Sequence, residues 1–153
     1  MKSRSRKIGK VATLAASEER RFGELAGRSR QQLNEQLERL GELNAFRHNY
    51  AKKSSDKSTV SSAHWQDYQN FLQRLNTAVS AQQQIVRDYE RNLETHRQRW
   101  MAKRQRVESL ERVLEKYEAE DRAHEGRTEQ KQLDELANAQ SGCFGGDDEE
   151  SRR

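Results

Sequence analysis

The sequence predicts an all-α protein, a long antiparallel two-helix coiled-coil hairpin with unequal arms and disordered ends. Positions at alternating three- and four-residue spacing run from Trp65 to Tyr117, and thirteen of these sixteen are apolar or aromatic. No glycine or proline interrupts residues 42–125. The 153-residue chain is 31% hydrophobic and 35% charged. Because compact domains are about 45–50% apolar, this composition favours an elongated helical protein over a globule.

The alternating spacing keeps one stripe of a helix facing a partner helix. The predicted seam positions are Trp65, Tyr68, Leu72, Leu75, Val79, Gln82, Val86, Tyr89, Leu93, His96, Trp100, Lys103, Val107, Leu110, Leu114 and Tyr117. A helix with such a stripe must pack lengthwise on another helix. This requirement favours a mechanical or tethering role over catalysis.

The chain divides into five predicted segments. Residues 1–7 form a basic flexible N-terminus, and a first helix covers residues 8–50. A polar turn follows at 51–60, then a second helix at 61–125 with a weaker helical extension to about 138. Residues 139–153 form a disordered acidic tail. Ser61 is the expected cap of the second helix, with Val60 and Trp65 placed as a hydrophobic staple.

The two arms fit each other when they fold back about the turn. In the favoured register the facing pairs are Leu40 with Leu72, Leu37 with Leu75, Leu33 with Val79, Arg30 with Gln82, Ala26 with Val86, Gly23 with Tyr89 and Ala12 with Trp100. Small residues then face large ones, which gives a reason for glycines that each cost a helix about 1 kcal/mol. Arg47 lies over the Trp65 ring in this register, where a cation–π contact is expected. A competing register follows Val11, Leu14, Phe22 and Leu25 through a local stutter.

The second arm is longer than the first. At a rise of about 1.5 Å per residue the arms would span roughly 95 Å and 65 Å, so the hairpin runs out of partner near Trp100. The seam residues beyond that point are Val107, Leu110, Leu114 and Tyr117. An apolar seam without a partner predicts an interaction site or self-association. The alternative is that the N-terminal segment slides over to cover part of this overhang.

Several apolar residues near the turn fall beside the seam, at heptad position g. They are Leu43, Tyr50, Phe71, Ala78 and Ile85, and Phe46 lies further round the same end of the first helix. In an antiparallel pair the two g edges share one side, so Leu43 and Phe71 become neighbours. Such residues either widen the buried stripe or dock a partner. The two aromatic rings and the leucine near the turn favour docking.

No motif for catalysis, metal binding or a cofactor is present. No glycine-rich loop precedes a Lys-Ser or Lys-Thr pair. The four histidines are scattered, and only Asp121 with His124 approaches the spacing of a helical metal site. The single cysteine, Cys143, indicates a reducing compartment. No stretch is long and apolar enough to span a membrane or act as a signal peptide, so we expect a cytoplasmic protein. Because catalytic motifs are missing, we also expect a protein without enzymatic activity.

Charge raises the alternative of nucleic-acid binding. The net charge is +4, with basic residues in excess up to Tyr117 and acidic residues in excess after it. A basic band could bind phosphates electrostatically; it comprises Arg97, Arg99, Lys103, Arg104 and Arg106. However, the band surrounds seam positions, and basic residues that flank a coiled-coil seam are usually solvated. No nucleic-acid partner is expected.

A short block on the second helix resembles the flagellar FliJ family. The block runs from Trp65 through Tyr68 and Gln69 to Phe71 and Leu72, with Leu75 after it and with Leu43, Phe46 and Tyr50 before the turn. The chain length, basic N-terminus, unequal arms and lack of catalytic motifs also agree. The acidic tail from Ser141 is a departure from the family pattern. The stalk of a virulence type III secretion system is the related alternative.

The resemblance implies a component of the bacterial flagellar protein export apparatus, needed for flagellum biogenesis and motility. Such a protein is monomeric when isolated and couples a hexameric export ATPase to the cytoplasmic domain of the membrane export gate. It also binds export chaperones, and it lies at the cytoplasmic side of the cell membrane through protein partners. The gate-binding residues implied are Leu43, Phe46, Tyr50, Phe71, Leu75 and Ala78, with Arg39 and Gln82. The overhang, Val107, Leu110, Leu114 and Tyr117, is the predicted contact with the ATPase ring, together with the basic N-terminal residues.

Overall fold

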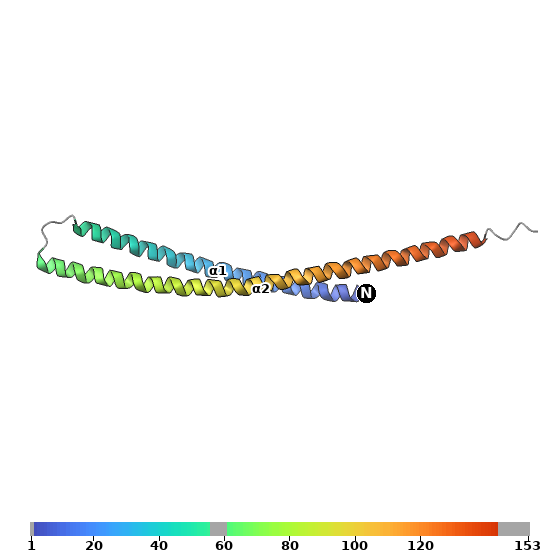
Figure 1. Cartoon of the computed structure of the whole chain (residues 1–153), viewed down its shortest axis with the longest axis horizontal. Coiled ribbons are helices and arrows are strands. Elements are labelled where there is room, and N and C mark those ends of the chain that lie inside the picture. Colours follow the sequence, from blue (N-terminus) through green and yellow to red (C-terminus); the bar gives the residue numbers. More distant parts are fainter. Residues whose placement is uncertain (1, 56–60, 144–153) are drawn as a thin grey trace, which may run out of the picture. The chain divides into compact units, whose positions relative to one another are not determined.

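The computed structural model describes residues 2–55 and 61–143, which form two antiparallel α-helices (Figure 1). Helix α1 runs over Lys2–Ser55 and has 54 residues, and α2 runs over Ser62–Cys143 and has 82 residues. The predicted all-α hairpin with unequal arms is therefore confirmed. Parts of two predicted segments lie outside the described residues: 56–60, the second half of the predicted turn, which includes Val60 of the predicted staple, and 144–153 of the predicted tail.

Both helices are longer than the sequence pattern indicates. Helix α1 begins at Lys2 rather than residue 8 and continues to Ser55, with Lys52 and Lys53 in a last turn whose dipole favours positive charge. Helix α2 continues through Gly126, in agreement with the predicted extension to about residue 138, and it ends at Cys143, so that residues 139–143 of the predicted disordered tail are helical. A glycine that keeps helical dihedrals costs only about 1 kcal/mol, and no described glycine has a positive φ. Polarity and glycine were thus poor predictors of the helix ends.

The start of α2 follows the predicted capping pattern in part. The backbone carbonyl of Ser61 accepts a hydrogen bond from the Trp65 amide at 3.1 Å, so Ser61 occupies the cap position before the helix. The Ser61 hydroxyl is 2.7 Å from Nδ1 of the His64 ring. This side-chain contact adds a local tie at the first turn of α2.

The chain divides into two compact units. Unit 1 combines Met1–Ala16 with Arg106–Arg153, and unit 2 is Ser17–Gln105. In unit 2 the buried residues of α2 are Leu75, Val79, Gln82 and Val86, all of them predicted seam positions. They face a stripe of α1 whose buried residues are Ala26, Ser29, Leu33 and Gln36. The seam predicted for α2 in this unit is confirmed except at its first position, since Trp65 is exposed.

The favoured register between the two arms was wrong by about one heptad. Gln82 hydrogen-bonds to Gln36 rather than facing Arg30, and Gly23 lies against Trp100 rather than Tyr89. The α1 stripe is also rotated, because Gln36 is buried while its neighbour Leu37 is exposed. A heptad repeat pairs apolar residues almost equally well in registers seven residues apart, so the apolar pattern could not distinguish them.

Two finer expectations about facing residues also change with the register. The Arg47 guanidinium does not cover Trp65; it donates to Asn76 Oδ1 at 3.3 Å and to Asn44 Oδ1 at 3.2 Å. The competing register through Val11, Leu14, Phe22 and Leu25 is also wrong, since only Phe22 is half-buried and the other three residues are exposed. The shift of the register by about one heptad moves Arg47 away from the first turn of α2, which explains why it does not contact Trp65.

Unit 1 contradicts the expectation of an uncovered overhang. The N-terminal segment of α1 packs on this part of α2, where Ala12 and Ala15 are buried and Gly9 lies against Leu114. The four overhang residues, Val107, Leu110, Leu114 and Tyr117, are half-buried. The earlier start of α1 and the shifted register together supply the missing partner. In unit 1, residues 122–143 of α2 are exposed throughout.

A candidate partner-binding surface of aromatic side chains

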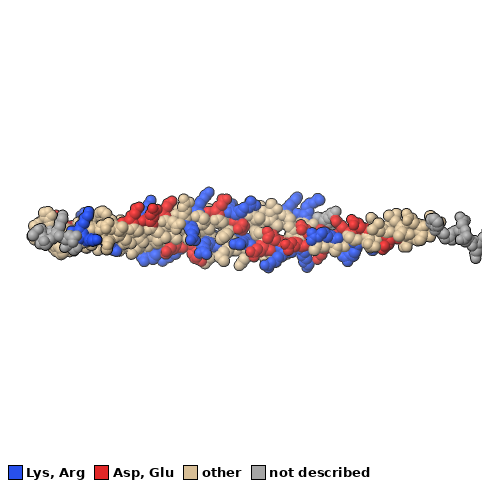
Figure 2. Space-filling view, turned by 90° about the horizontal axis from the view of Figure 1, so that it is seen from above, with Lys and Arg blue, Asp and Glu red and all other residues tan. Residues whose placement is uncertain are grey.

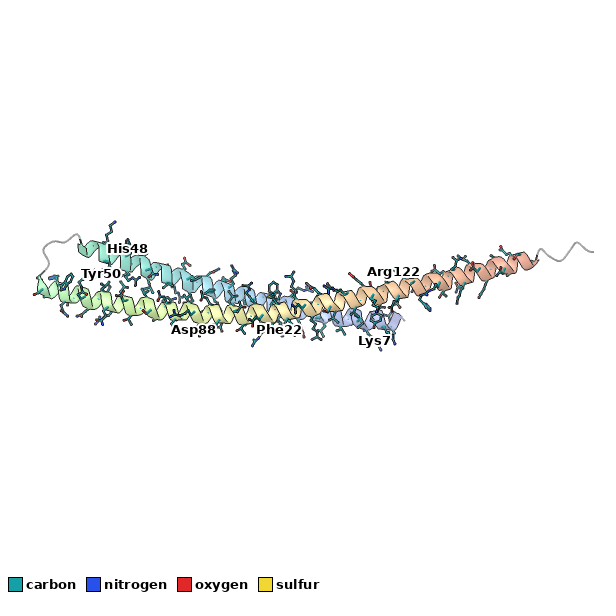
Figure 3. All side chains as sticks on the ribbon, viewed as in Figure 1. Lys7, Phe22, His48, Tyr50, Asp88 and Arg122 are labelled. Carbon is teal, nitrogen blue, oxygen red and sulfur yellow. The ribbon has the colours of Figure 1, made fainter. Side chains whose placement is uncertain are left out.

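Five aromatic side chains from both helices gather in unit 2, near the end of α1 and the start of α2. We call this set the aromatic surface; it comprises Phe46, Tyr50, Trp65, Tyr68 and Phe71. Tyr50, labelled in Figure 3, is the central member. Its ring centroid lies 5.1 Å from that of Tyr68 and 4.6 Å from that of Phe71.

The outer members extend the cluster along both helices. Phe46 lies 6.3 Å from Phe71 in an edge-on arrangement and 6.5 Å from Tyr50, and Trp65 stacks on Tyr68 at 5.8 Å. These separations are within the range in which aromatic pairs attract each other. Within one helix, the contacting rings are four residues apart on α1 and three residues apart on α2, the spacings at which side chains share one face of a helix. The cluster thus ties the two helices together beside the turn.

The aromatic surface remains open to solvent. Phe46 and Trp65 are each 53% exposed and Phe71 is 38% exposed, whereas Tyr50 is half-buried beneath them. Large apolar rings that stay this exposed, side by side, are typical of interaction sites. His48, on the same turn of α1, is exposed and points away from α2 (Figure 3). The surface is therefore confined to one side of α1.

The structure separates the predicted gate-binding residues into three groups. Phe46, Phe71, Ala78 and Arg39 are exposed, and Tyr50 and Leu43 are half-buried. Leu75 and Gln82 are buried between the helices, where they support the surface from below. Contact of these last two residues with a partner would require the hairpin to open.

Sequence reasoning missed Trp65 and Tyr68 as members of this surface. Their spacing continues the heptad pattern, which places both residues in the seam rather than on a docking surface. Tyr68 meets Tyr50 only in the observed register, one heptad from the favoured one. The signal that could have identified it is the density of aromatic residues on both sides of the turn.

A second cluster surrounds Trp100 inside unit 2. The indole Nε1 donates to Glu19 Oε1 at 2.8 Å, and the ring packs on the bare backbone of Gly23. The Lys103 ammonium pairs with Glu18 at 3.0 Å and lies 5.2 Å from the centre of the Phe22 ring. These contacts are half-buried and lie between the helices, which indicates a role in joining α1 to α2.

Two of the five residues of the basic band make contacts with neighbouring side chains in unit 2. Lys103 is paired with Glu18, and the Arg104 guanidinium lies 5.7 Å over the Trp100 ring. Figure 2 shows positive and negative side chains interspersed over the visible face. Nucleic-acid binders usually concentrate positive charge on one face. The observed distribution does not support the nucleic-acid alternative.

Neither a cluster of metal-ligand side chains nor a membrane-spanning helix is found among the described residues. Within 2–55 and 61–143, no group of three or more His, Cys, Asp or Glu side chains could hold a metal ion. Neither helix contains a stretch that is long and apolar enough to cross a membrane, as far as these residues extend.

Comparison with known proteins identifies the family. The family model described as "Flagellar FliJ protein" matches residues 4–142. The chain is similar to the flagellar FliJ protein of Escherichia coli (strain K12), with 31% identity over 120 residues, which cover 77% of this chain and 79% of that protein. No solved structure matches the chain. A match over nearly all of the described residues shows that the chain belongs to the flagellar FliJ family of non-enzymatic flagellar export proteins.

Proposed function

We propose that the chain is a coupling component of the flagellar export apparatus. It docks on the cytoplasmic domain of the membrane export gate through the aromatic surface, and on the hexameric export ATPase through unit 1. It also binds export chaperones, and it acts at the cytoplasmic side of the membrane through these protein partners. The observation that carries the proposal is the exposed aromatic surface on a member of the FliJ family.

The aromatic surface has the properties of a protein-binding hot spot. Aromatic side chains provide large contact areas at low entropic cost and are enriched among residues that dominate binding energy. Phe46 and Phe71 project from different helices and are held edge to face. Because the buried Leu75 fixes the helix pair beneath them, little ordering is needed when a partner binds. Arg39 and Ala78 are exposed and complete the proposed contact.

The proposed contact with the ATPase ring involves unit 1. Its overhang residues, Val107, Leu110, Leu114 and Tyr117, are half-buried, so each still presents part of its side chain. Farther along α2, Leu133 and Leu136 are among the most exposed large apolar residues of the described chain. Apolar side chains on a helix with no intramolecular cover are suited to burial against a partner.

The gate-binding part of this proposal predicts a large effect of two truncations. We expect Phe46→Ala combined with Phe71→Ala to weaken binding to the purified gate domain by about 30-fold or more, since two hot-spot residues each contribute more than about 1 kcal/mol. Isothermal titration calorimetry with the full chain measures the dissociation constant. Circular dichroism should show unchanged helicity, because both rings are substantially exposed.

A matched pair of exposed residues in the same unit provides the control. Met101 and Leu25 are 53% and 37% exposed, against 53% for Phe46 and 38% for Phe71. Met101→Ala with Leu25→Ala should therefore leave gate binding unchanged, as should Leu133→Ala with Leu136→Ala in unit 1. Equal losses in the control and the aromatic variant would refute the assignment of the gate contact to the aromatic surface.

A further inference from the structure

The seam of unit 2 can be paired in more than one way. Both helices repeat their apolar positions every seven residues, so a slide by one heptad again sets apolar residues against each other. In the observed register Leu40 lies opposite Val79, because the contacts of Gln36 with Gln82 and of Arg47 with Asn76 bracket it. In the shifted register Leu40 would face Leu72. Apolar burial alone therefore does not decide between the two.

A buried polar contact does distinguish the registers. The side-chain amide of Gln82 donates to Gln36 Oε1 and to the Gln36 backbone carbonyl, both at 3.0 Å, and both residues are buried. After a one-heptad slide Gln36 would face the apolar Leu75. A buried amide without a partner is costly, and a polar pair at one seam position is a known means of fixing register.

The same register assembles the aromatic surface. The ring contacts across the two helices, Tyr50 with Tyr68, Tyr50 with Phe71 and Phe46 with Phe71, all lie at centroid distances of 6.3 Å or less. A slide by one heptad moves one helix along the other by about 10 Å. That displacement exceeds every one of these separations, so the cross-helix ring contacts cannot survive it.

We propose that Gln36 and Gln82 are positioning residues that hold the hairpin in the register in which the aromatic surface is assembled. The register one heptad away is the competing state, and in it the surface is taken apart. The effect on docking rests on the proposed gate contact, whereas the effect on register does not.

Disulfide trapping tests the register directly. On a Cys143→Ser background, Leu40→Cys with Val79→Cys reports the observed register and Leu40→Cys with Leu72→Cys reports the shifted one. Each pair is equilibrated in a glutathione redox buffer, and intrachain disulfides are quantified on non-reducing gels. The test variant combines Gln36→Leu with Gln82→Leu. The control combines Gln32→Leu with Gln83→Leu, which makes the same change at two exposed positions nearby.

We expect the shifted disulfide to be scarce in the parent chain and in the control, and to rise about tenfold in the test variant. Helicity should be retained, because leucine suits a seam position. Gate binding should be weaker when the chain is locked through Leu72→Cys than when it is locked through Val79→Cys.

Three outcomes would overturn parts of the proposal, and each is distinguishable. An unchanged shifted disulfide in the test variant would refute the positioning role of the two glutamines. Equal gate binding by the two locked chains would refute the link between register and docking. Normal gate binding by the Phe46→Ala and Phe71→Ala variant would refute the proposed gate contact but leave the disulfide result valid.

Discussion

Replacing Val79 by aspartate is expected to lower the free energy of unfolding by about 3–5 kcal/mol, because an isolated charge between two apolar helix faces cannot be solvated. Val79 is 2% exposed and is the most deeply buried large side chain in the described residues. The loss should appear as a lower urea midpoint in far-ultraviolet circular dichroism. The change removes seam packing in unit 2 without altering any exposed residue.

The matched control for this substitution is Ala81→Asp. Ala81 lies on α2, two residues from Val79, and is exposed. The same new charge on the same helix should lower stability by less than about 1 kcal/mol, which is mainly the lower helix propensity of aspartate. Equal losses of stability at both positions would contradict the burial of Val79 between the two helices. The added charge would then act only through helix propensity or net charge.

The second large effect is expected at Trp100. Trp100→Ala should lower the free energy of unfolding by about 2–4 kcal/mol, because it removes a packed ring and leaves the Glu19 carboxylate without its indole donor. Trp100→Phe keeps most of the ring and should recover the larger part of this loss. Urea unfolding of the three chains measures both values. A loss below about 1 kcal/mol for Trp100→Ala would mean that this cluster does not join the helices.

Two glycines provide an internal check on the same contact. A Cβ added at Gly23 would lie 3.0 Å from Trp100 Nε1, whereas one added at Gly27 would meet nothing within 4 Å. Gly27→Ala should therefore stabilise the chain by about 1 kcal/mol. Gly23→Ala should destabilise the parent chain, because the added Cβ meets the Trp100 ring. In the Trp100→Ala variant the same substitution should stabilise the chain by about 1 kcal/mol, as at Gly27. The reversal of sign is the signature of direct contact between Gly23 and Trp100.

The sequence was informative about what each helix buries on its own. The three- and four-residue spacing of α2 identified Leu75, Val79, Gln82 and Val86, all of which are buried. Each of these positions depends only on the periodicity of one helix, which sterics and burial impose locally. The principle that glycine on α1 faces an aromatic ring on α2 was also right, although the ring is that of Trp100.

Facing residues were harder to predict, because register depends on a few polar contacts rather than on the apolar stripe. Nothing in the heptad pattern shows that Gln36 pairs with Gln82, or that Glu19 accepts from Trp100. In the register favoured from the sequence, the overhang has no partner helix and Tyr68 lies away from Tyr50. The candidate docking residues Phe46, Tyr50 and Phe71 were named from the sequence, but their assembly into one surface depends on the register.

Hydroxyl-radical footprinting of the unaltered chain tests the central claim, that the aromatic surface docks the export gate, most directly. The method measures the solvent exposure of individual side chains, and Met101 provides a reactive reference in the same unit that is as exposed as Phe46. On addition of the gate domain, we predict strong protection of Phe46 and Phe71 and no change at Met101. Unchanged oxidation of both phenylalanines at saturating gate domain, or protection confined to unit 1, would contradict the account.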